Sequence, residues 1–159
     1  MKKKLILLFI GSLFLSCSSS KTIRTSKKII KGDWTINSIT YDTSGTYKVS
    51  LFNDVSKECF EGSSWHFIPN NFTGNYTINN SDCKIGERYF RFNIQEVDKE
   101  TGLYSFLLKP TNTKYKSDDN RGFRLKLSQL SDTNMQWQQI INVDGKPFTI
   151  NLNFIKNQN

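Results

Sequence analysis

The chain has 159 residues, a formal net charge of +8, 13% aromatic residues and a mean hydropathy of −0.51. This length suits one domain with a single core. One histidine and three cysteines lack the clustered ligands of a metal centre, so we expect neither a metal nor a cofactor.

Residues 1–16 have the pattern of an export signal. Three lysines at positions 2–4 precede an apolar run over residues 5–15, which is shorter than the ~20 residues that a membrane-spanning helix needs. We therefore expect this segment to be a signal peptide that is cleaved.

The end of this segment, Leu15-Ser16-Cys17, resembles the lipobox of bacterial lipoproteins. The resemblance implies that Cys17 becomes the first residue of the mature chain and carries fatty acyl chains such as palmitate, which hold it to the membrane. Because Ser18 and not Asp follows the cysteine, the analogy favours the outer membrane, with the protein facing the periplasm. The alternative is an ordinary secretory signal with a chance cysteine at the cleavage point.

Residues 17–31 are rich in Ser, Thr and Lys, and we predict a lipidated tether that ends in about one helical turn. Much of the basic charge lies here, and it either attracts anionic lipid or keeps a linker solvated. Nucleic acid is not an expected partner, because the protein is exported and the rest of the chain has no basic stripe interleaved with stacking aromatic residues.

Residues 32–159 read as one all-β domain. Apolar and polar residues alternate with period two, and no window of helical length carries a 3.6-residue apolar stripe. About one turn of helix is expected within residues 53–62, and a polar loop over Pro110–Gly122. Nine strands are predicted, at Trp34–Tyr41, Thr46–Phe52, Ser64–Ile68, Asn75–Ile78, Tyr89–Val97, Leu103–Lys109, Phe123–Ser128, Met135–Ile141 and Phe148–Phe154.

The cysteine count points to a disulfide. Three cysteines in an exported chain leave two once Cys17 takes the lipid, so Cys59 and Cys83 are expected to pair in the oxidising compartment. The alternative is two free, buried thiols.

The first predicted strand opens with Gly32-Asp33-Trp34, and a Gly-x-Trp at this position resembles the opening motif of lipocalins. The resemblance implies an antiparallel up-and-down calycin barrel of about 8–9 strands, closed at one end by Trp34 packed against a cation from a late strand. Arg124 and Lys156 are both candidates for that cation. A META-type domain, which also opens with a Gly-x-Trp strand, is the structural alternative.

Such a barrel predicts a binding role. Its interior is either filled by side chains or just wide enough for one small ligand, and many large rings favour a packed or narrow interior. The leading hypothesis is a membrane-tethered protein that binds a small hydrophobic or amphipathic ligand. The alternative is a filled barrel that presents the 111–121 loop to an envelope protein partner or acts as an inhibitor. The candidate lining residues are Trp65, Phe67, Tyr76, Phe90, Phe92, Phe123, Trp137 and Phe148.

An enzyme is not expected. His66 is the only imidazole, it sits between two aromatic residues in a predicted strand, and no nucleophile motif accompanies it. We therefore assign no catalytic residue.

Overall fold

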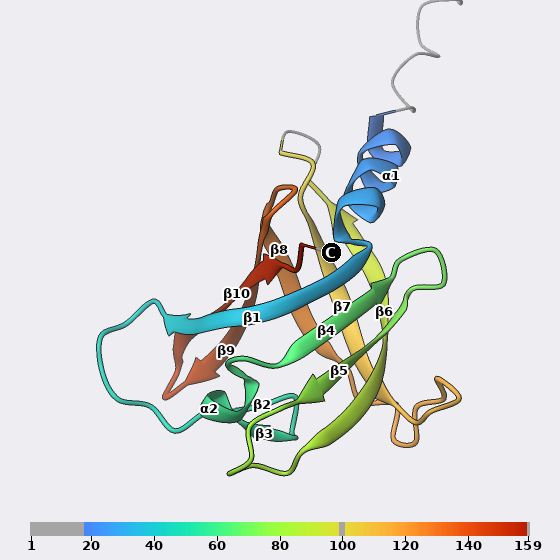
Figure 1. The fold of residues 1–159 in the computed structure, drawn as a ribbon. Helices are drawn as coiled ribbons and strands as arrows, with labels where there is room; N and C mark the ends of the chain where they lie inside the picture. The colour runs from blue at the N-terminus through green and yellow to red at the C-terminus, as the bar shows by residue number, and fades with distance from the viewer. Residues whose placement is uncertain (1–17, 99–100, 159) are drawn as a thin grey trace, which may run out of the picture.

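The computed structural model describes residues 18–98 and 101–158, and the predicted signal peptide and Cys17 lie outside this part of the chain. Eight strands form a closed antiparallel barrel, in which β4 to β10 follow one another round the ring and β1 pairs with both β4 and β10 (Figure 1). The predicted all-β, antiparallel up-and-down barrel is confirmed. Its strands are β1 (Gly32–Tyr41), β4 (Ser64–Ile68), β5 (Thr73–Ile78), β6 (Gly86–Val97), β7 (Tyr104–Thr111), β8 (Phe123–Leu130), β9 (Asn134–Val143) and β10 (Lys146–Lys156).

Alternating side chains turn one face of each strand inward. In β10, every second residue from Phe148 to Phe154 is buried, and the residues between them are only half-buried on the outer side. Bulges interrupt the register of β1, β6 and β8 and increase the local twist that lets the sheet close. In β5, a side chain at Gly74 would lie 2.5 Å from the Phe90 ring, so the glycine makes room for that ring.

The predicted barrel strand over Thr46–Phe52 is wrong. Only β2 (Ser50–Leu51) is extended there, and it pairs with β3 (Val55–Ser56) in a separate two-stranded sheet. The strand ends at Leu51 because Phe52 and Asn53 have φ angles of 52° and 55°, which belong to the left-handed region and not to a strand. The barrel therefore has eight strands and not nine.

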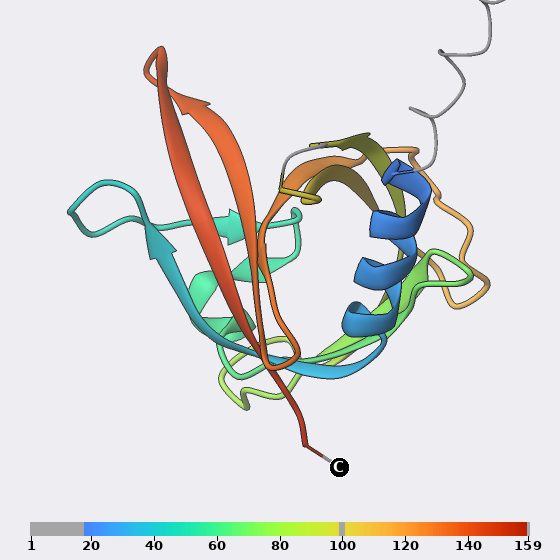
Figure 2. The ribbon, with the colours of Figure 1, turned by 90° about the horizontal axis from the view of Figure 1, so that it is seen from above.

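The helical part of the predicted tether is longer than the single turn expected. Residues Ser18–Ile30 form a helix, α1, of 13 residues, which lies over one opening of the barrel (Figure 2). Ser26 and Ile30, one turn apart on the same face, are buried against the barrel, and this contact stabilises a segment without an apolar stripe of its own. No helix among the described residues is long and apolar enough to cross a membrane.

The opposite end of the barrel is closed by the segment between β1 and β4. It contains β2, β3 and a one-turn helix, α2 (Lys57–Phe60), and it buries Leu51, Phe52 and Phe60. A disulfide between Cys59 and Cys83, with Cα atoms 5.8 Å apart, links α2 to the turn before β6. The predicted cysteine pairing and the predicted turn of helix are both confirmed.

Candidate functional site

The barrel interior holds most of the predicted lining residues. Phe123 is only half-buried, because it is the first residue of β8 and packs at the rim against Phe52, with ring centroids 5.3 Å apart. The other seven are buried, namely Trp65, Phe67, Tyr76, Phe90, Phe92, Trp137 and Phe148.

These rings fill the barrel around Trp65. Seven aromatic rings have their centroids within 6.3 Å of the Trp65 ring, and its indole N–H donates to Ser63 Oγ at 2.9 Å. Between Ile30 of α1 and the ring of Trp137 a space of only about 10 Å³ remains. That is about the smallest volume that holds one water molecule. The barrel interior is therefore filled by side chains, which is one of the two predicted alternatives, and is not wide enough for a small ligand.

The Gly-x-Trp segment joins α1 to the barrel. Gly32 has a φ of 107°, which favours glycine and lets the chain turn from the helix into β1. The Trp34 indole N–H donates to the Ile30 carbonyl at 2.8 Å, and the Lys156 ammonium donates to the Ile29 carbonyl at 2.6 Å. The same ammonium lies 5.2 Å from the Trp34 ring centroid. Lys156, and not Arg124, is therefore the cation on Trp34, and the pair also caps the helix C-terminus.

Replacing Lys156 by methionine should release α1. The variant keeps most of the apolar stem but loses the cation above the Trp34 ring and the charged hydrogen bond to the Ile29 carbonyl. We therefore expect the free energy of unfolding to fall by about 2 kcal/mol. Urea denaturation would measure the loss, and amide hydrogen exchange would show faster exchange in α1. The control is Arg124→Met, which removes an exposed cation and should change the free energy of unfolding by less than about 0.5 kcal/mol. Equal effects of the two variants would contradict this role of Lys156.

A polar network closes the other end of the barrel. Arg88 Nε donates to Asp54 Oδ2 at 2.8 Å, and the Tyr76 hydroxyl donates to the same oxygen at 3.0 Å. Burial, and then the Asp54 charge, raise the pKa of Tyr76 well above its usual value, so the phenol stays a donor. The three groups satisfy one another, which is typical of a structural network.

His66 lies on the outer face of the barrel. Its Nδ1 is 2.7 Å from Asp33 Oδ1, and both side chains are more than two-fifths exposed. Within the described residues no serine, threonine or cysteine side chain is hydrogen-bonded to either of them, so the pair forms no hydrogen-bonded triad there. The described residues also hold no group of three or more His, Cys, Asp or Glu side chains able to bind a metal.

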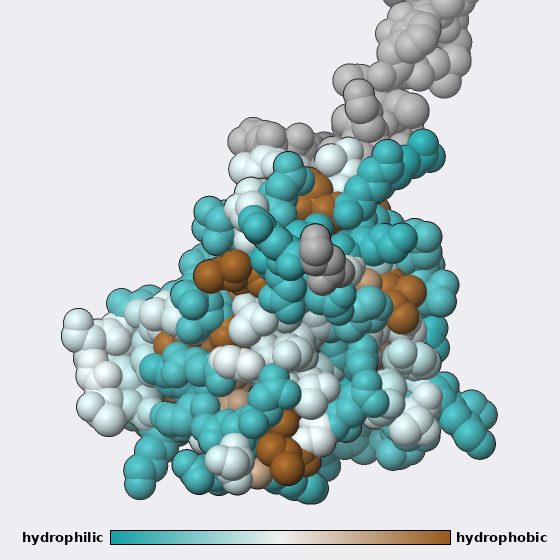
Figure 3. All heavy atoms as spheres, in the orientation of Figure 1, coloured by the Kyte–Doolittle hydropathy of each residue, from teal (hydrophilic) through white to brown (hydrophobic). Residues whose placement is uncertain are grey.

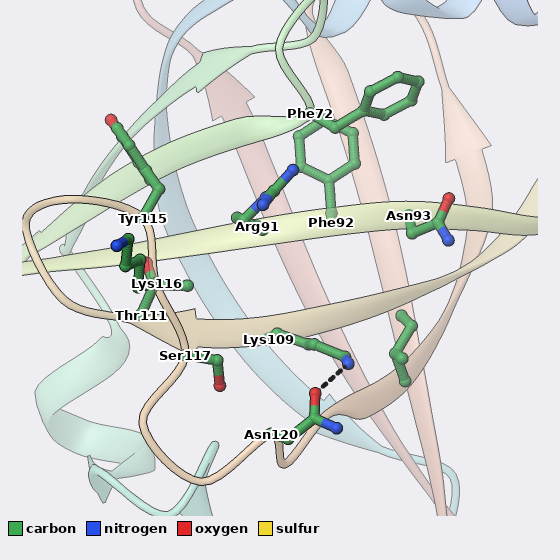
Figure 4. A pocket seen from close by; sticks show the side chains of 11 residues that line it. Phe72, Arg91, Phe92, Asn93, Lys109, Thr111, Tyr115, Lys116, Ser117 and Asn120 are labelled. Carbon is green, nitrogen blue, oxygen red and sulfur yellow. Dashed lines mark hydrogen bonds between the residues drawn. The ribbon is translucent and has the colours of Figure 1, made fainter.

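A groove on the outside of the barrel is much larger than the space that remains inside it. The face of the protein drawn in Figure 3 is mostly hydrophilic, with small scattered apolar patches. The groove, of about 680 Å³, lies between the outer faces of β6 and β7 and the 112–122 loop (Figure 4). Its lining brings together Arg91 of β6, Lys109 of β7 and Lys116 of the loop, and no Asp or Glu is among the residues that line it.

The sequence predicts only part of the groove lining. The long polar loop is predicted as a presenting segment, and Lys116 and Ser117 lie within it. Arg91 and Lys109 were not predicted as site residues. The alternation of side chains along β6 nevertheless places Arg91 on the outer face, because Phe90 and Phe92 point inward. Arg91 and Lys109 lie side by side because β6 and β7 pair in a register that places these two residues opposite each other.

No protein-family model and no curated protein matches this sequence. Among solved structures, the chain is similar to a lipocalin-like protein from Bacteroides uniformis ATCC 8492, with 9% sequence identity and a TM-score of 0.49 over 81% of this chain and 99% of that one. The strand pairing of this chain itself establishes the closed barrel.

Proposed function

We propose that this chain is a lipid-tethered protein of the cell envelope that recognises its ligand or partner on the outside of a filled barrel. The observation that carries the proposal is the contrast between the two spaces, about 10 Å³ inside the barrel and about 680 Å³ in the outer groove. A drug-sized or lipid-like ligand needs a cavity of roughly 300 Å³ or more.

The position of α1 supports a fixed attachment to the membrane. The helix begins at Ser18, directly after the proposed lipid-bearing Cys17, and it would span about 20 Å at 1.5 Å per residue. Its C-terminal carbonyls are bonded to Trp34 and Lys156. The barrel would therefore be held close to the bilayer with its α1 end toward the lipid, on the periplasmic side of the outer membrane.

The filled interior predicts that an apolar probe does not bind the wild-type protein and does bind Phe106→Ala. Phe106 is buried, lines the remaining internal space and lies 4.9 Å from the Trp137 ring centroid. Its removal should open a dry apolar cavity, at a cost of about 3 to 5 kcal/mol. Titration with indole, followed by calorimetry, would measure the binding.

The control for this titration is Ile140→Ala, which removes an apolar side chain that is 59% exposed and opens no cavity. It should bind indole no better than the wild type. Should Phe106→Ala fail to fold, Leu108→Ala removes another buried side chain from the same strand. Saturable binding of indole, or of a fatty acid, inside the wild-type barrel would contradict the proposal.

A catalytic role is not part of the proposal. The exposed His66–Asp33 pair is hydrogen-bonded to no serine, threonine or cysteine side chain in the described part of the chain, and the Asp54–Arg88–Tyr76 network is internally satisfied. Both arrangements are ordinary for structural polar groups.

A further inference from the structure

Positive charge in the outer groove is not balanced by the protein. Arg91 and Lys109 are cross-strand partners in β6 and β7, and like charges in directly opposed positions destabilise a sheet. Neither Arg91 nor Lys116 forms an ion pair with a described residue, and the Lys109 ammonium donates only to the neutral amide of Asn120, at 2.6 Å. Neither acidic residue of the loop lines the groove: Asp119 pairs with Arg121, and Asp118 accepts a hydrogen bond from the neutral amide of Asn112 at 3.4 Å.

Two hydroxyl groups in the same groove have no partner. Thr111 Oγ1 and Ser117 Oγ are buried and form no hydrogen bond with any described residue, although both side chains line the groove. Buried polar atoms are nearly always hydrogen-bonded, so each exception calls for an explanation. Both oxygens are covered by neighbouring atoms, so a ligand in the groove would contact them only if their side chains turned toward it.

The loop that carries these groups is held in place. Asn112 Oδ1 accepts from the backbone N–H of Lys114 and of Lys116, and the Lys116 carbonyl accepts from the N–H of Asn112. Tyr115 has a φ of 55°, which is unfavourable for tyrosine, and its ring packs edge-on against Tyr89. The groove is thus largely formed in advance, which lowers the entropy lost on binding.

A cation of α1 lies beside one residue of the groove lining. Phe72 lines the groove, and the Lys27 ammonium of α1 lies 3.8 Å from its ring centroid. The cations that line the groove therefore come from β6, β7 and the loop, and Lys27 of the helix lies next to the lining residue Phe72.

We propose that this groove binds a phosphate group, carried either on a small soluble molecule or on a lipid headgroup. The inference rests on the proposed function, because it assigns a ligand class to the outer surface. Arg91 of β6, Lys109 of β7 and Lys116 of the loop supply one guanidinium and two ammonium groups to the groove lining, and these suit an anion with several acceptor oxygens. The arrangement favours phosphate over a planar carboxylate, which a single arginine binds from one side.

The test is a calorimetric titration of the full mature chain, in nonionic detergent and at low salt, with inorganic phosphate and with glycerol 3-phosphate. We expect saturable binding at one site, weakened about tenfold or more in Arg91→Gln and in Lys116→Gln. The control variant is Lys146→Gln, which removes an exposed charge from the β9–β10 turn, far along the chain from the groove. Absence of saturable binding, or equal weakening in Lys146→Gln, would overturn the proposal.

A second arm separates the two sources of phosphate. The Cys17→Ala form, which lacks the proposed anchor, is sedimented with phosphatidylcholine vesicles that do or do not contain phosphatidic acid. Sedimentation that requires phosphatidic acid and is lost in Arg91→Gln assigns the site to a lipid headgroup. Binding of glycerol 3-phosphate without vesicle sedimentation assigns it to a soluble ligand. Sedimentation that survives Arg91→Gln, with no binding of soluble phosphate, would refute the groove as the site.

The indole titration distinguishes a failure of this inference from a failure of the proposed function. If phosphate does not bind and the wild-type interior excludes indole, only the ligand class is wrong. If the wild-type barrel takes up indole, the proposed function fails whatever the groove binds.

Discussion

Trp65→Ala is expected to lower the free energy of unfolding by about 4 to 5 kcal/mol, the upper part of the range for removing a buried tryptophan. Trp65 is 1% exposed and lies among seven aromatic rings contributed by the barrel strands and the segment that closes one end. The substitution leaves a cavity that these rings cannot collapse into without leaving their rotamers. It also removes the indole donor to Ser63 Oγ.

Trp65→Phe is the matched variant. It keeps an aromatic ring at the same position and should cost about half as much, because the volume lost is smaller. Urea denaturation followed by near-ultraviolet circular dichroism would measure both losses, and Ile155→Ala, at a side chain that is 44% exposed, provides the surface reference. A cost below about 2 kcal/mol for Trp65→Ala would mean that the interior is loosely packed, and the proposed function would lose its support.

The barrel strands could be predicted because burial repeats every two residues along them. In β10 the inward row from Phe148 to Phe154 is visible directly in the sequence. Strand ends are less visible, because they depend on pairing and not on side-chain type. β6 begins at Gly86, three residues before the predicted start at Tyr89, because Gly86, Glu87 and Arg88 still pair with β5.

The features missed by the sequence all depend on contacts between distant segments. α1 has no apolar stripe, and its stability comes from burial of Ile30 and from the bonds that Trp34 and Lys156 make to its last carbonyls. The short Gly-x-Trp motif pointed to the right end of the barrel, but the choice between Arg124 and Lys156 required the register of β1 with β10. The groove likewise required the register of β6 with β7.

Whether the interior is hollow or filled also depended on the three-dimensional arrangement. The sequence contains enough rings to fill a small barrel, and it favoured a packed or narrow interior. It could not predict that Leu51, Phe52 and Phe60, from outside the barrel strands, would close one end and that Ile30 of α1 would close the other. With both ends closed, the space available to a ligand moves to the outer surface.

Cys17→Ala is expected to abolish membrane attachment of the exported protein. Two or three acyl chains on Cys17 would give stable anchoring, whereas α1 alone, with a few cations near the lipid, would give only weak attraction that salt screens. For this experiment residues 1–16 are exchanged for a conventional secretory signal peptide, so that cleavage does not depend on the thiol. We expect the variant in the soluble periplasmic fraction and the unaltered chain in the outer-membrane fraction, with labelled palmitate incorporated only in the latter.

The matched control for Cys17→Ala is the double variant Cys59→Ala and Cys83→Ala. It removes the two cysteines of the disulfide and leaves Cys17, so it should remain membrane-bound and palmitate-labelled while losing about 3 kcal/mol of stability. A salt wash of each membrane fraction separates acyl anchoring, which resists salt, from attraction through the lysines of α1, which does not. Membrane retention of the Cys17→Ala form after that wash would show that something other than the lipid holds the protein, and the proposed anchor would be wrong.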